Sequence, residues 1–181
     1  MTKVLLFSDG ACRGNQEEFN TGGYGALLIY GKHRKEIHGG ARNTTNNIME
    51  LTGMIEGLKA LKRKDISLEI YSDSAYIINA FRENWVDKWL LNGWKTASKK
   101  DVENKELWQE LISLVRACDK VEFYKIKGHL SVDSASVENW YQKFRAQKEV
   151  SLDEFKDYLL LNQRVDQLAN LGADEVTHDS K

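Results

Sequence analysis

Residues 4–9 read VLLFSD, a nearly continuous apolar run that ends on an acidic residue. Such a run is typical of a strand that is buried on both faces of a sheet. Because the run is short and charged residues soon follow, it predicts neither a signal peptide nor a membrane-spanning helix. We therefore expect a central strand that places Asp9 at the end of a sheet.

Short connections after this strand predict an antiparallel meander. Residues 22–25 read GGYG and are interpreted as a turn, followed by strands at residues 26–30 and 34–39. Two later segments, residues 67–72 and 121–126, also read as strands and are separated by helical patterns. A meander followed by alternating helices and strands predicts an α/β fold with a mixed sheet and right-handed crossovers.

The segment after the third strand predicts a helix that brings another acid to the sheet. Thr44 or Thr45 is a suitable N-cap for a helix that runs to about Lys62. Apolar residues recur at spacings of three and four between residues 48 and 58. Glu50 lies beside this apolar stripe, so we expect it where the helix meets the sheet.

The acidic residues form a pattern that indicates a metal site. Asp73 directly follows the strand at 67–72, as Asp9 follows the first strand, and carboxyl ends of parallel strands gather ligand sites. Asp166 is a fourth acid, with Asp174 as its rival. Clustered carboxylates resist ionisation, and cations that prefer oxygen ligands, such as Mg²⁺, reverse this. For any one acid alone, an ordinary loop-end or capping role stays open.

The overall charge of −1 over 181 residues is not that of a typical polyanion-binding protein. Local patches matter more than the total. The basic run at residues 59–64 is interpreted as a solvated helix face. A second basic group surrounds three tryptophans and is interpreted as a binding surface: Lys88, Lys95, Lys99, Lys100 and Lys105.

Several motifs, each weak alone, together resemble the type 1 ribonuclease H family and cover most of the chain outside residues 130–161. The matching segments are FSDGACRGN (7–15), GGYGA (22–26), TTNNIMEL (44–51), YSDS (71–74), NGWKTA (92–97), NKELW (104–108), KGH (127–129) and NQRVDQLA (162–169).

The resemblance implies a fold and an activity. The fold would be a ribonuclease H-like five-stranded sheet, three antiparallel strands and then parallel ones, flanked by helices. Residues 1–181 would form one domain, with a handle region at about 82–103 and a helical insertion at about 130–161. The activity would be endonucleolytic hydrolysis of the RNA strand of RNA–DNA hybrids, leaving 5′-phosphate and 3′-hydroxyl ends.

The resemblance also assigns the catalytic residues. Asp9, Glu50, Asp73 and Asp166 would hold two Mg²⁺ ions, with Mn²⁺ as a substitute, and His129 would help proton transfer or product release. The alternatives are a catalytically silent nucleic-acid-binding module of the same fold and a related-fold nuclease that acts on DNA. We expect a stand-alone, monomeric, cytoplasmic protein without membrane association.

By the same resemblance, three groups of residues would contact the hybrid. Asparagines would contact its minor groove, where the 2′-hydroxyl distinguishes RNA from DNA. A pocket would hold a phosphate of the DNA strand, and the handle would hold the hybrid, whereas Trp94 and Trp108 are expected in the core. The three groups are Asn15, Asn46 and Asn47; Thr45 and Asn104; and Trp85, Trp89, Lys95, Lys99 and Lys100.

The largest departure from the family pattern is the spacing between His129 and Asp166, which are much closer together in many relatives. The extra segment is rich in aromatic residues and predicts a helical hairpin near the rim of the site. We favour an extension of the core over a contact with the hybrid.

Overall fold

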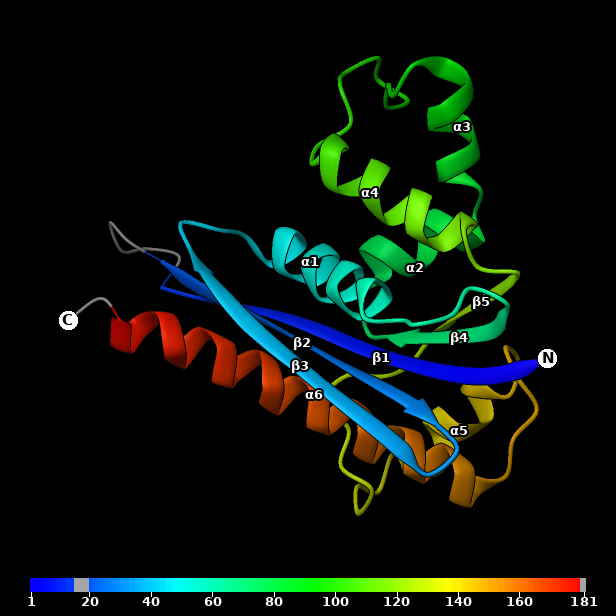
Figure 1. Ribbon diagram of the computed structural model, residues 1–181. Helices are drawn as coiled ribbons and strands as arrows, with labels where there is room; N and C mark the ends of the chain where they lie inside the picture. The colour runs from blue at the N-terminus through cyan, green and yellow to red at the C-terminus, as the bar shows by residue number, and fades with distance from the viewer. Residues whose placement is uncertain (15–19, 180–181) are drawn as a thin grey trace.

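A mixed five-stranded sheet forms the centre of the protein (Figure 1). The computed structural model describes residues 1–14 and 20–179. The strand order is β3-β2-β1-β4-β5, with β1, β2 and β3 antiparallel and β4 and β5 parallel to β1. The predicted fold class is therefore confirmed. The strands are β1 (Thr2–Arg13), β2 (Thr21–Tyr30), β3 (His33–Arg42), β4 (Ile66–Ser72) and β5 (Lys120–Lys125).

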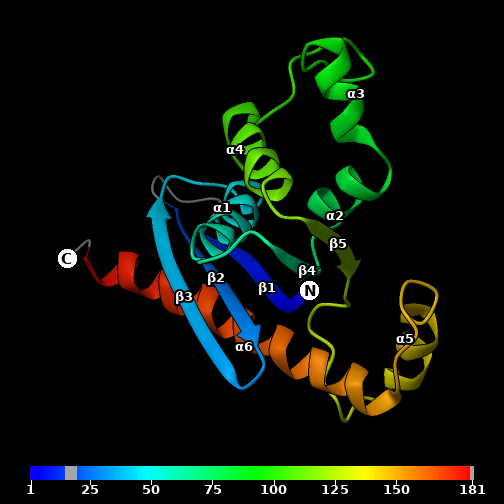
Figure 2. The same ribbon diagram turned by 45° about the vertical axis from the view of Figure 1, so that its right-hand side comes forward.

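Helices cover both faces of the sheet and create two cores (Figure 1, Figure 2). Adjacent residues of β1 divide between them, because Leu6 packs in the core under α1 while Phe7 packs in the core under α6. Both side chains are fully buried, as the apolar run predicted. One side of the sheet carries α1 (Asn46–Lys59), α2 (Ala75–Arg82), α3 (Trp85–Asn92) and α4 (Lys105–Arg116), and the other carries α5 (Val137–Phe144) and α6 (Leu152–Asp179).

The GGYG segment belongs to β2, so its interpretation as a turn is wrong. Its glycines instead let α6 cross directly over the strand. A Cβ atom at Gly23 would lie 1.9 Å from the carbonyl oxygen of Ala169, and one at Gly25 would lie 2.6 Å from the Cβ of Leu168. Glycine in a strand often marks such a close approach. The contact fixes the half of α6 that follows Asp166.

The segment at 130–161 contains α5 and the first part of α6, and it packs on the second core. Phe144 and Phe155 are buried there. A half-buried lysine also fastens this segment to β4: the Nζ of Lys148 donates to Glu69 Oε1 at 2.9 Å and to the hydroxyl of Tyr71 at 2.8 Å. The segment therefore extends the core beneath β4 and β5.

Other boundaries also differ slightly from the predictions, including β4 at 66–72 rather than 67–72 and β5 at 120–125 rather than 121–126. The helix after β3 ends at Lys59 rather than at about Lys62, and β3 extends over residues 33–42 rather than 34–39. Thr45 is the N-cap, since its Oγ1 accepts from the backbone N–H of Ile48 at 3.1 Å. Within the described ranges, no helix has the length and apolar character required to cross a bilayer.

Candidate active site

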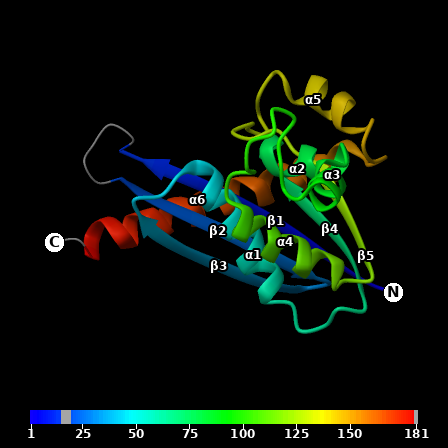
Figure 3. The same cartoon turned by 90° about the horizontal axis from the view of Figure 1, so that it is seen from above.

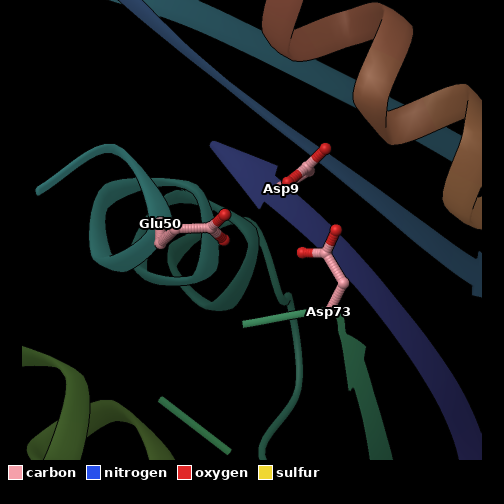
Figure 4. A group of neighbouring side chains, drawn as sticks. All are labelled: Asp9, Glu50 and Asp73. Carbon is pink, nitrogen blue, oxygen red and sulfur yellow. The ribbon is translucent and has the colours of Figure 1, made fainter. Parts of the chain in front are cut away.

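Three carboxylates from three elements meet at one end of the β1–β4 pair (Figure 4). Asp9 lies within β1, two residues beyond the last residue that pairs with β4. Glu50 lies on α1, and Asp73 directly follows β4. One ligand oxygen from each residue lies within 4.8 Å of the others. The structure thus brings together the three acids that the sequence pattern selected.

Burial and mutual repulsion dominate the electrostatics of this cluster of carboxylates. Burial, and then the negative charge of Asp73, raise the pKa of Asp9 from 3.8 to about 8. Burial and the charge of Asp9 hold the pKa of Glu50 well above its ordinary value. Burial also raises the pKa of Asp73, although the charge of His129 opposes this. Several close, hard oxygen donors that resist ionisation are a suitable ligand set for a divalent cation.

A buried oxygen supports the same interpretation. Oε2 of Glu50 is inaccessible to solvent and has no hydrogen-bond partner among the described residues. Leaving such an atom without a partner is unfavourable unless something else satisfies it. A cation bound among these carboxylates would satisfy it, so the residues present fit a divalent metal.

Asp166 lies in the same region as this cluster. It lines a pocket of about 220 Å³ together with Asp9, Asp73 and His129. Its negative charge raises the pKa of both Asp9 and Asp73. The rival acid, Asp174, instead forms an ion pair with Arg13.

The position of His129 depends on the glycine before it. A Cβ atom at Gly128 would lie 2.1 Å from Oδ2 of Asp73, so only glycine lets this loop pass so close to the acid. His129 itself is exposed, with a left-handed φ of 55°. The KGH motif therefore places an accessible imidazole on the pocket wall.

Asn162 is a site residue to which the sequence reasoning gave no role. It lines the pocket, is only 5% exposed, and its Oδ1 has no hydrogen-bond partner among the described residues. The available signal was its spacing, because residues four apart on a helix share a face and Asn162 precedes Asp166 by four.

The residues assigned to a phosphate pocket lie at the starts of two neighbouring helices. Thr45 caps α1, and Asn104 directly precedes α4 and donates to the hydroxyl of Tyr76 at 3.4 Å. Figure 3 shows α1 and α4 side by side over the sheet. Asn46 and Asn47 form the first turn of α1, whereas Asn15 lies outside the described residues.

The handle residues do not all face solvent. Trp85 and Trp89 pack against the first core, with the Trp89 ring 5.8 Å from that of Trp94 and 5.1 Å from that of Trp108. Trp94 and Trp108 are buried, as expected. Lys95 forms an ion pair with Asp101. Lys99 and Lys100 are exposed.

Comparison with known proteins decides the family. The family model described as RNase H matches residues 1–151. This chain belongs to the ribonuclease H family. A ribonuclease H from Clostridium botulinum is 54% identical over 129 residues, which cover 71% of this chain and 85% of the relative. The expectation of an enzyme of this family is therefore confirmed.

Solved structures of ribonucleases H share the fold. The crystal structure of LC9-RNase H1, a type 1 RNase H with the type 2 active-site motif, has a TM-score of 0.63 and 27% identity, covering 85% of this chain and 80% of that one. The crystal structure of LC11-RNase H1 in complex with RNA/DNA hybrid has a TM-score of 0.61 and 18% identity, and the match covers 96% of this chain and 99% of that one. The ribonuclease H family match ends before α6 and so does not include Asp166.

Proposed function

We propose that this protein is a type 1 ribonuclease H that hydrolyses the RNA strand of RNA–DNA hybrids and leaves 5′-phosphate and 3′-hydroxyl ends. One observation carries the proposal, namely the convergence of Asp9, Glu50 and Asp73 within 4.8 Å. The relatives named ribonuclease H support it, and so does a neighbour of the same fold that was solved with an RNA/DNA hybrid. We further propose that the protein acts as a monomer in the cytoplasm, without membrane association.

The proposed cofactor is a pair of Mg²⁺ ions, with Mn²⁺ as a substitute, held by Asp9, Glu50, Asp73 and Asp166. When bound, the ions supply positive charge that favours ionisation of the attacking water and stabilises the leaving oxygen of the phosphodiester. The cluster of Asp9, Glu50 and Asp73, with Asp166 on the pocket that Asp9 and Asp73 also line, supports this, because ion binding would relieve the mutual repulsion of the carboxylates. Asn162 lines the pocket, and its Oδ1 has no partner in the described part of the chain, so it is a further candidate contact.

His129 is proposed to take part in proton transfer or product release. Its ring is accessible on the wall of the pocket that Asp73 and Asp166 also line. Its charge lowers the pKa of Asp73, so the two groups are close enough to interact. A histidine suits this task because its charge changes near neutral pH.

The substrate contacts are proposed by position. The N-termini of α1 and α4 offer backbone N–H groups to an anion, and the hydroxyl of Thr45 can still donate its proton to a phosphate while it caps the helix. Asn104 is placed at the start of the second helix, α4. The proposed minor-groove contacts are Asn15, Asn46 and Asn47, and the proposed handle contacts are Trp85, Trp89, Lys95, Lys99 and Lys100.

The decisive experiment compares four labelled substrates, namely the hybrid, duplex RNA, duplex DNA and single-stranded RNA, in EDTA and over a titration of Mg²⁺ and Mn²⁺. We expect metal-dependent cleavage of the RNA strand of the hybrid alone, with products that carry 5′-phosphates. Binding of hybrid without cleavage at any metal concentration would support the silent binding module. Cleavage of duplex DNA would support the related-fold DNA nuclease.

A further inference from the structure

A group of lysines surrounds a tryptophan on α5, in the segment that departs most from the family pattern. The Nζ atoms of Lys143 and Lys127 lie 4.4 Å and 5.0 Å from the centre of the Trp140 ring. Lys125 lines the same small pocket, of about 100 Å³. We call Lys125, Lys127 and Lys143, together with Trp140, the α5 basic patch.

The lysines of the α5 basic patch form no ion pair within the described residues, although the charge of Lys125 lowers the pKa of nearby Asp73. All three lysines are exposed, and none forms an ion pair with an acid in residues 1–14 and 20–179. Two acids of the α5 segment are engaged elsewhere, because Glu138 accepts from Gln142 and Glu149 pairs with Arg145. Converging ammonium groups repel one another, and the face of the indole ring partly offsets this repulsion. An anion between them would complete the arrangement.

The α5 basic patch is held rigidly against the edge of the sheet. The backbone N–H of Lys125 donates to Oε1 of Gln147 at 2.8 Å, and Nε2 of Gln147 donates back to the carbonyl of Lys125 at 2.8 Å. Arg82, at the end of α2, donates to the same Oε1. Buried Phe144 and Phe155 line the pocket beside the lysines. A preformed site loses less entropy when it binds a ligand.

The α5 basic patch is a close neighbour of the acidic cluster. Lys125 pairs in register with Ser72, the residue before Asp73, and adjacent strands lie about 4.8 Å apart. The backbone N–H of Ile126 donates to the carbonyl of Ser72 at 3.0 Å, and Lys127 precedes His129 by two residues. The handle helix α3 lies on the opposite side of the sheet (Figure 1, Figure 2). A duplex that crosses the acidic cluster would therefore pass beside this patch.

We propose that the α5 basic patch binds phosphates of the RNA–DNA hybrid next to the scissile position. The inference rests on the proposed function, since it names a second contact surface for the same substrate. The ligand is a phosphate rather than a stacked base, because ammonium groups already lie over the Trp140 ring. Phosphate contacts of this kind fix the position of a duplex without reading its sequence.

The test is hybrid binding by a triple variant and a matched control. The triple variant is Lys125→Gln, Lys127→Gln and Lys143→Gln. The control carries the same change of charge at exposed positions near the β2–β3 turn and after α1, namely Lys32→Gln, Lys35→Gln and Lys62→Gln. All proteins also carry Asp73→Asn, so that the labelled hybrid stays intact, and their thermal unfolding is compared first. Dissociation constants are measured by fluorescence anisotropy over a range of salt concentrations.

We expect the triple variant to bind the hybrid about tenfold or more weakly, and the control to stay within about twofold of the parent. The logarithmic salt slope should fall by about 0.9 for each phosphate that the variant no longer neutralises. Equal binding by the triple variant and the control, whether both keep or both lose affinity, would overturn the proposal. So would weaker binding without a change in salt slope.

A second pair of variants tests the tryptophan without changing charge. Trp140→Phe keeps an aromatic face under the lysines and should bind like the parent, whereas Trp140→Leu should bind several times more weakly. Equal binding by the two would remove the ring from the proposal. Cleavage of hybrid by the wild-type protein is measured separately, so failure of the proposed function and failure of this site give different results.

Discussion

Two regions of this molecule have nearly the same composition, lysines beside tryptophan, but use it differently. In the handle, Trp89 packs on Trp94 and Trp108, and Lys95 is paired with Asp101. In the α5 basic patch, Trp140 lies under two lysines that have no acidic partner within the described ranges. The handle tryptophans therefore hold a protrusion together, whereas Trp140 arranges charge beside the acidic cluster.

The difference shows that a lysine–tryptophan pattern does not by itself identify a binding surface. Two properties decide this: whether the tryptophan ring is packed in the core, and whether the lysine ammonium group already forms an ion pair with an acid. By both measures the α5 basic patch is better suited than Lys95 to bind an anion, because its lysines form no ion pair in the described residues whereas Lys95 pairs with Asp101. Lys99 and Lys100 are also exposed cations of the handle.

The largest expected effect is a loss of hybrid cleavage without a loss of hybrid binding by the handle or the α5 basic patch. Asp73→Asn removes one carboxylate of the cluster and should lower hybrid cleavage on the order of 10³-fold or more, because metal-derived charge stabilisation is worth several kcal/mol. Hybrid binding should persist, since neither the handle nor the α5 basic patch is altered. Single-turnover cleavage and anisotropy measure the two properties. Near-normal cleavage by this variant would remove Asp73 from the proposed metal site.

Local sequence patterns predicted the antiparallel meander, the later strands that alternate with helices, and the three-acid cluster, whereas the arrangement of the five-stranded sheet came from the family resemblance. The apolar runs before Asp9 and Asp73 predict buried strands, and they place each acid at the end of its strand. The α1 stripe similarly placed Glu50 at the sheet.

Other features depend on contacts between distant segments, and the sequence pattern could not show them. Residues 22–25 have turn composition, yet they form part of β2 because α6 needs their missing side chains. Trp85 and Trp89 lie four residues apart and therefore share a helix face, but the direction in which that face points depends on how α3 packs against Trp108. The pairing of Lys95 with Asp101 follows from the shape of the loop between them.

The next effect compares the two tryptophans directly. Trp89→Ala should lower the free energy of unfolding by about 3 kcal/mol, because it removes a large side chain packed between other rings. Trp140→Ala should destabilise the protein less and weaken hybrid binding more. Urea unfolding and anisotropy on the same two proteins make the comparison. If Trp89→Ala weakened binding more than Trp140→Ala at equal stability, the roles given to the two regions would be reversed.

A smaller effect concerns the acidic cluster beside the α5 basic patch. The pKa of Asp9 is about 8 in the folded protein and near 3.8 in the unfolded chain. At a pH between these two values, the folded state therefore retains a proton that the unfolded state has released. Without metal, this contribution to stability is present below about pH 4 and disappears as the pH rises towards 8. The unfolding temperature of the wild type in EDTA should therefore fall, relative to Asp9→Asn, over this window.

Metal should reverse this trend. Mg²⁺ displaces the proton, so it should raise the unfolding temperature of the wild type most at the alkaline end and that of Asp9→Asn much less. Thermal melts from pH 4 to 9, with and without Mg²⁺, provide the measurement. A parallel pH dependence in both proteins would mean that Asp9 ionises normally.

The smallest effect is a direct contrast of single lysines. Lys143→Gln should weaken hybrid binding about threefold and reduce the salt slope by about 0.9, because the substitution removes an unpaired cation. Lys95→Gln should change binding less, since Asp101 already competes for that ammonium. Asp101→Asn should then strengthen binding in the Lys95 protein but not in the Lys95→Gln background. If Lys95→Gln and Lys143→Gln were equivalent in affinity and salt slope, ion pairing in the free protein would not decide which lysines meet the hybrid.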